Sequence, residues 1–157
     1  VQQDQTQRVA ALAATIWREH YTPLLGREQV EYMLEKFQSA EAMAQQIGEG
    51  YRYYLMEVGG KAAGYAAIKP EGETMFLSKI YVSQPYRRQK LAARTLSYLE
   101  EIAREQHCHS MYLTVNKHNS GSIAAYQKLG FQKVRTQKED IGGGFFMDDD
   151  IMEKEII

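Results

Sequence analysis

The sequence contains little cysteine and proline and no long apolar run. Its 157 residues include one cysteine, Cys108, and three prolines. A single cysteine excludes an internal disulfide and suits a reducing compartment. No segment approaches the about 18 apolar residues of a membrane-spanning helix, and the first residues lack the pattern of a signal peptide. We therefore expect one soluble domain over residues 1–157, located in the cytoplasm.

The sequence also lacks an excess of charge of either sign. Nineteen basic and twenty acidic side chains leave a net charge of −1 at pH 7. A protein that binds nucleic acid across a whole face is usually strongly basic, so we expect neither a nucleic-acid nor a membrane partner. Any recognition of an anion must then come from a local group of residues.

The first third of the chain carries apolar side chains at helical spacing. The first helix is expected to gather on one face Val9, Leu12, Ala13, Ile16 and Trp17. A break is expected at Tyr21–Pro23, because proline interrupts helices. Two shorter helices should follow at Arg27–Phe37 and Glu41–Ile47, the second ended by Gly48.

The remaining chain alternates between strand and helix patterns. Gly59–Gly60 is a strong hairpin signal between two predicted strands. Strands are expected at Tyr51–Val58, Ala62–Ile68, Thr74–Val82, Met111–Val115, Phe131–Thr136 and Phe145–Glu153. Helices are expected at Leu91–Gln106 and at Ser120–Leu129, the latter stopped by Gly130. This order predicts an α/β fold with a mixed sheet.

Three cations stand immediately before the predicted Leu91 helix: Arg87, Arg88 and Lys90. The N-terminus of a helix carries partial positive charge and repels each bare cation by about 0.3–1 kcal/mol. Several free backbone N–H groups meet there, and together with the cations they would suit a phosphate group. A basic turn that simply faces water is the alternative.

A second motif lies about thirty residues further on, as Asn119-Ser-Gly-Ser-Ile-Ala-Ala-Tyr-Gln-Lys-Leu-Gly-Phe131. It resembles motif B of the GNAT (Gcn5-related N-acetyltransferase) family. The segment Tyr81–Ala92 resembles motif A of the same family, [Q/R]-x-x-G-x-[G/A], with Arg87 at its first position and Ala92 at its last. The two motifs have the order and spacing of the family. The resemblance implies the GNAT acyl-CoA N-acyltransferase fold, with a mixed, mostly antiparallel sheet flanked by helices.

The resemblance also implies acetyl-CoA as the co-substrate. Its diphosphate would lie on the backbone N–H groups of residues 88–92, and its pantetheine would pair with a strand end that splays from its neighbour. Asn119 would lie near the coenzyme and is also a preferred helix N-cap. The expected coenzyme-binding residues are Ile80, Tyr81, Val82, Arg87, Arg88, Gln89, Lys90, Leu91, Ala92, Asn119 and Tyr126.

The sequence departs from the family pattern at Lys90, which stands where relatives usually have glycine. A lysine with positive φ would cost on the order of 1–2 kcal/mol. We therefore expect Lys90 to adopt the right-handed helical conformation. The chain also leaves almost no room for the strand with which family members open.

Acetyl transfer to an amine requires two proton movements. An amine like that of lysine has a pKa of about 10.4, so a base must accept its proton or the site must bind the neutral form. The departing thiolate has a pKa of about 8.5 and can be protonated by a phenol. The resemblance places Tyr126 where the family carries such a tyrosine, and we expect it to be the general acid. A tyrosine that only packs on its helix is the alternative.

The base is left open by the sequence. No Glu occurs in Phe76–Val82, where some relatives carry one. Candidates are Glu31, the run Asp148–Asp150, and a chain of water molecules. In a strand, Asp148 and Asp150 share one face and Asp149 takes the other. Solvated charges on an edge strand are the plainer interpretation of this run.

The acceptor pocket would be built, as in relatives, by the first two helices and the last strands. The candidate lining residues are Trp17, Tyr21, Glu31, Tyr32 and Phe145, for which core packing is the alternative. His107, Cys108, His109 and His118 do not complete a set of four metal ligands, so no metal site is expected.

The combined prediction is an enzyme that transfers acetyl from acetyl-CoA to a primary amine. The ending from Asp140 to Lys154 resembles relatives that act on small amines, polyamines among them. A catalytically silent acyl-CoA-binding domain and a transferase acting on protein N-termini or lysines are the alternatives, and a homodimer is left open.

Overall fold

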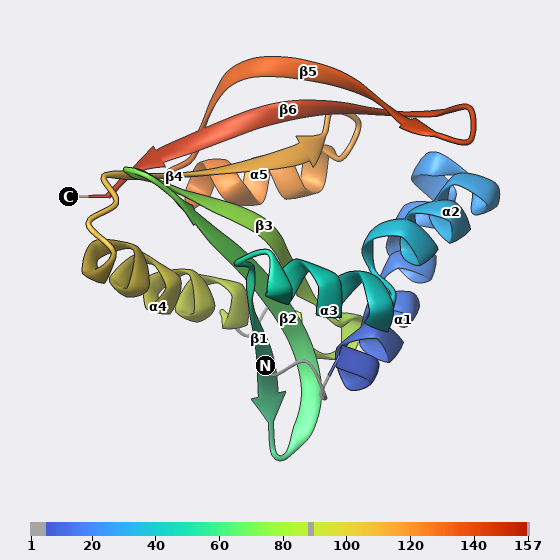
Figure 1. Cartoon of the computed structure of the whole chain (residues 1–157), viewed down its shortest axis with the longest axis horizontal. Coiled ribbons are helices and arrows are strands. Elements are labelled where there is room, and N and C mark those ends of the chain that lie inside the picture. Colours follow the sequence, from blue (N-terminus) through green and yellow to red (C-terminus); the bar gives the residue numbers. More distant parts are fainter. Residues whose placement is uncertain (1–5, 88–89, 157) are drawn as a thin grey trace.

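The computed structural model describes residues 6–87 and 90–156. Three helices open the chain, and six strands follow with two further helices between them (Figure 1). The elements are α1 (Thr6–Leu25), α2 (Arg27–Phe37), α3 (Ala40–Gly48), β1 (Arg52–Val58), β2 (Lys61–Glu71), β3 (Thr74–Val82), the 3-10 turn η2 (Gln84–Tyr86), α4 (Leu91–Glu105), β4 (Ser110–Asn116), α5 (Ser120–Lys128), β5 (Gln132–Gly142) and β6 (Phe145–Glu155). The predicted α/β fold is confirmed.

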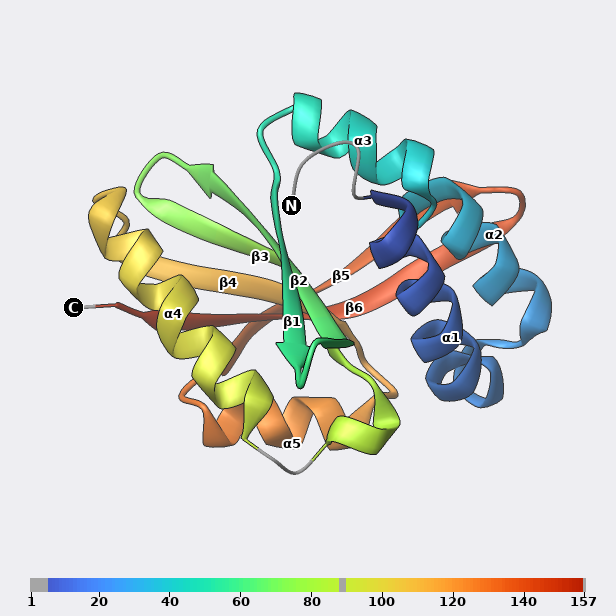
Figure 2. The same cartoon turned by 90° about the horizontal axis from the view of Figure 1, so that it is seen from below.

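The six strands form one sheet in the order β1-β2-β3-β4-β6-β5. All neighbours are antiparallel except β3 and β4. Each face of the sheet carries its own apolar core. Met75 and Leu77 pack with α4 on one face, and Tyr53 and Tyr65 pack with α1, α2 and α3 on the other. Figure 2 shows α4 and α5 apart from α1, α2 and α3.

The predicted break at Tyr21–Pro23 is wrong, because α1 continues to Leu25 with Pro23 inside it. Proline in the last turn removes only one hydrogen bond of the helix. The Gly26 N–H donates to the Thr22 carbonyl at 2.9 Å, so the final turn still closes. Gly26, with φ of 87°, then redirects the chain into α2.

The two parallel strands separate soon after they begin. They pair only from Thr74 opposite Ser110 to Phe76 opposite Tyr112. A β-bulge follows at Ser78, because Leu77 lies opposite Ile68 while Lys79 lies opposite Ala67. The bulge reverses the alternation of side chains, so Leu77 faces the α4 core and Lys79 faces α2 and α3. The predicted splay of this strand end is thus present.

The hairpin of β5 and β6 extends to α2 at the other end of the molecule (Figures 1 and 2). The Tyr32 hydroxyl donates to the Ile141 carbonyl at 2.7 Å, and Lys36 Nζ donates to the same oxygen. Gln29 Nε2 donates to the Phe146 carbonyl at 3.1 Å. A Cβ on Gly142 would lie 2.6 Å from the Tyr32 hydroxyl oxygen, so this close contact requires glycine. These bonds fix the hairpin against the helices.

Within the described residues, no helix is both long and apolar enough to span a membrane.

Candidate active site

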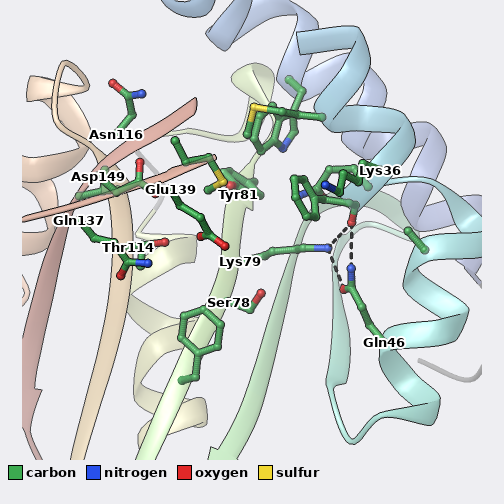
Figure 3. A pocket seen from close by; sticks show the side chains of 18 of the residues that line it. Lys36, Gln46, Ser78, Lys79, Tyr81, Thr114, Asn116, Gln137, Glu139 and Asp149 are labelled. Atoms are coloured by element: carbon green, nitrogen blue, oxygen red, sulfur yellow. Dashed lines mark hydrogen bonds between the residues drawn. The ribbon is translucent and has the colours of Figure 1, made fainter. Parts of the chain in front are cut away.

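A cavity of about 750 Å³ lies between the first three helices and the strands that diverge from each other (Figure 3). Its lining includes residues from α1, α2, α3 and from strands β3 to β6. Such a volume suits a small ligand. The cavity exists because β3 and β4 stop pairing after Phe76 and Tyr112, which leaves the strand edges beyond them without partners.

Aromatic side chains of α1 and β3 form one wall of the cavity. The ring centroids of Trp17 and Tyr21 are 4.4 Å apart, and Tyr81 lies 5.7 Å from Trp17 and 6.3 Å from Tyr21. Burial raises the pKa of the Tyr21 hydroxyl. Trp17 and Tyr21 were predicted as lining residues, and both line the cavity. Both also belong to the apolar core on this face of the sheet, so each of them packs in the core and lines the cavity.

Asn119 connects this wall to α5. Its side-chain oxygen accepts a hydrogen bond from the Ser122 N–H at 3.3 Å, so it is the N-cap of α5 as predicted. Its Nδ2 donates to the Tyr21 hydroxyl at 3.5 Å. The residue is 5% exposed. One buried amide therefore fixes α5 relative to the cavity.

Tyr126, the predicted general acid, lies on the same helix and is half-buried. Its ring packs edge-on against Phe131, with centroids 6.0 Å apart. Burial raises the pKa of the Tyr126 hydroxyl, and the nearby Tyr21 raises it further. No described residue hydrogen-bonds to this hydroxyl. The phenol is therefore protonated at neutral pH and free to donate.

Asp149 is a buried carboxylate in the cavity lining, 7% exposed. It lies on β6, opposite Asn116 of β4 and Gln137 of β5. Burial raises its pKa to about 6, and the negative charges of Asp148, Glu139 and Asp150 contribute to the increase. Asp149 is thus a better proton acceptor than an ordinary aspartate while it is still ionised at pH 7.

The neighbouring carboxylates face the opposite side of β6, as the alternation predicts. Asp148 pairs with Lys117, and a hydrogen bond from that lysine lowers the pKa of Asp148. Asp150 is 7% exposed, with Lys133 at 3.5 Å. Solvated edge-strand charges are therefore the wrong interpretation for Asp149 and Asp150, because β5 covers the outer edge of β6.

Tyr126 and three of the predicted acceptor residues lie outside the cavity lining. Glu31 is held by Arg18 through two hydrogen bonds of 3.0 and 2.8 Å. The hydrogen bond from Arg18 lowers the pKa of Glu31, so this carboxylate is a poor base. Tyr32 and Phe145 pack against each other with centroids 5.3 Å apart. These two rings support the hairpin contact with α2.

An anion site is predicted at the start of α4. The helix begins with the bond from Arg94 N–H to the Lys90 carbonyl, 3.0 Å long. The N–H groups of Leu91 and Ala92 therefore have no acceptor within the helix. Arg87 Nε donates to the Val82 carbonyl at 2.9 Å, which turns this side chain back onto β3. Arg88 and Gln89 lie outside the described residues.

The expectation of a right-handed conformation at Lys90 is wrong. The residue has φ of 60° and ψ of 21°, the left-handed region that the family's usual glycine adopts freely. The chain must turn sharply from β3 into α4. This turn fixes the backbone conformation at position 90, whichever residue occupies that position. The lysine costs on the order of 1–2 kcal/mol there.

Sequence reasoning missed Lys79. This lysine is 6% exposed and lines the cavity. Its Nζ donates to the Phe37 carbonyl at 2.7 Å, to Gln46 Oε1 at 3.0 Å and to the Tyr53 hydroxyl. Burial lowers its pKa to about 7. A lysine within a strand was the one available signal, but the bulge that directs it inward leaves no mark in the sequence.

The histidines and the cysteine considered for a metal site form no ligand cluster in the part of the chain that the structure describes. Cys108 is buried, with its Sγ donating to the Gly72 carbonyl at 3.7 Å. Across residues 6–87 and 90–156, no three His, Cys, Asp or Glu side chains gather as metal ligands would.

Comparison with known proteins places this geometry in a family. The model of the acetyltransferase (GNAT) family matches residues 10–131. The [ribosomal protein bS18]-alanine N-acetyltransferase of Escherichia coli K12 is 27% identical over 100 residues, which are 64% of this chain and 68% of that protein.

Solved structures show the same fold. The PaiA N-acetyltransferase of Thermoplasma acidophilum, in complex with coenzyme A, superposes with a TM-score of 0.83 at 21% identity, covering 99% of this chain and 95% of that one. The ribosomal-protein-S18-alanine N-acetyltransferase of Escherichia coli gives a TM-score of 0.64 at 26% identity, covering 75% and 77%. Because the family model spans most of the chain and includes both motifs, the protein belongs to the GNAT family of acetyltransferases and uses acetyl-CoA as its co-substrate.

Proposed function

We propose that the protein acetylates the primary amine of a small molecule bound in the cavity, with Asp149 as the base and Tyr126 as the acid. The observation that carries this proposal is Asp149: a buried carboxylate with a raised pKa, in the lining of a cavity between strands that diverge. Perturbed acids in a cleft are common among catalytic groups.

The coenzyme would enter along the free edge of β3. Backbone groups of Ile80, Tyr81 and Val82 have no strand partner on the β4 side, so the pantetheine amides can pair with them. The diphosphate would accept hydrogen bonds from the N–H groups of Leu91 and Ala92, beside Arg87 and Lys90. Arg88 and Gln89 remain predicted contacts.

The reaction follows from these positions. Asp149 holds the acceptor and removes a proton from its nitrogen, whose lone pair attacks the thioester carbon. The C–N bond forms and a tetrahedral intermediate results. The C–S bond then breaks, and its electron pair goes to sulfur, which takes a proton from Tyr126. The nitrogen gives its second proton to the resulting Tyr126 phenolate, which leaves a neutral amide and restores the acid. The raised pKa of Tyr126 keeps its proton available until the thiolate develops.

The bond network between α2 and the hairpin favours a small acceptor. Tyr32, Lys36 and Gln29 all bond to hairpin carbonyls, and they bring the β5–β6 arm against the helices beside the cavity. A protein substrate would need an open approach along this side. Peptide N-termini are nevertheless the second acceptor to test, because the bS18-alanine relative acts on a protein.

The test is thiol release from acetyl-CoA against a panel of small amines and alanine-starting peptides. We expect transfer to small amines. The Asp149→Asn variant should lose at least tenfold in kcat while Asp148→Asn, on the opposite face of the same strand, retains the rate. Tight coenzyme binding without transfer to any amine would favour the silent acyl-CoA-binding alternative and refute the proposal.

A further inference from the structure

Lys79 and Asp149 are buried charges that line one cavity and form no ion pair with any described residue. Asp150, the other buried charged residue, has Lys133 within 3.5 Å. Figure 3 shows Lys79 directed toward Gln46 on one side of the cavity and Asp149 on the other side. Lys79 is protonated below its pKa of about 7, and there the molecule holds two opposite charges, neither paired with a described residue, across a space that a ligand can fill.

The fold does not need the Lys79 ammonium to satisfy the groups around it. The Phe37 carbonyl also accepts from Gln46 Nε2 at 3.1 Å, and Gln46 Oε1 also accepts from the Tyr53 hydroxyl at 2.5 Å. These two acceptors each have a second donor, and the Tyr53 hydroxyl keeps its own bond to Gln46, so the lysine can release a bond without leaving a buried oxygen unpaired. A buried cation held only by neutral oxygens is unfavourable for folding, which indicates a role in the site.

We infer that the acceptor carries an anionic group, a carboxylate or a phosphate, at the end remote from its reacting amine, and that Lys79 recognises this group. The inference rests on the proposed function, since it takes the amine to lie at Asp149. One such ligand would compensate both buried charges at once. A diamine would instead bring its second ammonium toward Lys79, which repels it.

The topology sets the length of this acceptor. Lys79 lies on β3 and Asp149 on β6, with β4 between them. Neighbouring strands are about 4.8 Å apart, so the two backbones are separated by at least about 10 Å. A chain of roughly four to eight atoms between amine and anion fits this span. Figure 3 also shows Glu139 between Asp149 and Lys79, and the exposed lining residues Lys36, Arg135, Glu49 and Glu139 together add no net charge to the cavity.

The test compares three acceptors of equal length: 6-aminohexanoate, hexylamine and 1,6-diaminohexane. We expect kcat/KM for the amino acid to exceed that of both others by at least tenfold, mainly through KM, as a charge-assisted contact would give. Lys79→Met should abolish this preference, with kcat/KM for 6-aminohexanoate falling to the value that the same variant shows for hexylamine. Lys79→Gln, which keeps a hydrogen-bonding side chain without the charge, should do the same if the methionine variant is poorly folded.

The matched control is Lys69→Met. Lys69 also projects from a central strand and lies over the Tyr51 ring at 5.0 Å, outside the cavity lining. It should retain the preference. Three results would overturn the inference while the proposed function stands. They are equal kcat/KM for the three amines, a preference for the diamine, and an equal loss of kcat/KM with all three amines in both Lys79 variants. Absence of transfer to any amine would overturn both.

Discussion

Replacement of Lys79 by methionine should change how the stability of the protein depends on pH. Burial lowers the folded-state pKa of Lys79 to about 7 from its usual value of 10.5. Between these values the unfolded chain binds more protons than the folded one, so stability rises with pH across this window. For these two pKa values, the linkage relation gives a gain of about 2 kcal/mol from pH 7 to pH 9. Methionine cannot titrate and should remove this gain.

The assay is urea unfolding of both proteins at pH 7, 8 and 9, at one salt concentration. The difference between the two free energies of unfolding cancels the other titrating groups, since both proteins share them. The variant should also fold well, because Phe37, Gln46 and Tyr53 keep the bonds among themselves. Parallel pH profiles would refute the reasoning, and they would show that Lys79 is as solvated as a surface lysine.

The remaining predictions concern catalysis and the strand that borders the cavity. The rate of acetyl transfer should rise with pH through about 6 as Asp149 ionises, and Asp149→Asn should lose this rise; a persistent rise would exclude Asp149 as the base. Tyr126→Phe should lower kcat by about 10²-fold or more without weakening coenzyme A binding by calorimetry. The exposed Tyr98→Phe on α4 should have no effect. Gly64→Ala should destabilise the fold by about 1–3 kcal/mol in thermal unfolding, because its Cβ would lie 2.4 Å from the Tyr81 carbonyl oxygen; an unchanged Tm would contradict this close approach.

The proposed coenzyme site consists largely of backbone groups that have no partner within the fold. The free edge of β3 and the free N–H groups at the start of α4 are both polar groups that a folded chain normally satisfies internally. In the proposed function, the coenzyme supplies the partners of these groups. The left-handed Lys90 and the bulge at Ser78 are the local distortions that create them.

The local pattern of the sequence was enough for most of the secondary structure. The bounds of α2 and β3 agree with the prediction, and those of α4 and α5 differ at one end by a single residue. Helical and strand periodicity act over a few residues, so they are visible without the fold. The prediction failed at Pro23, where packing of the preceding turn outweighs one lost hydrogen bond.

The functional site could be predicted from the sequence only in part. The two motifs identified the family, the N-cap at Asn119 and the position of Tyr126 on its helix. The sequence could not show, however, which of the candidate carboxylates has the properties of a base. Glu31 and Asp149 have the same chemistry as isolated side chains. Arg18 neutralises one, and burial among other acids raises the pKa of the other.

The sequence by itself therefore determined the elements, their order and the family, because each depends on residues close together along the chain. Only the tertiary structure decided which charges are buried and which are paired. A bulge of one residue directs Lys79 to the inner face, and β5 covers the edge that would have exposed Asp149. Burial and ion pairing depend on residues that are far apart in the sequence. They set the electrostatics of the cavity, on which the proposed choice of acceptor depends.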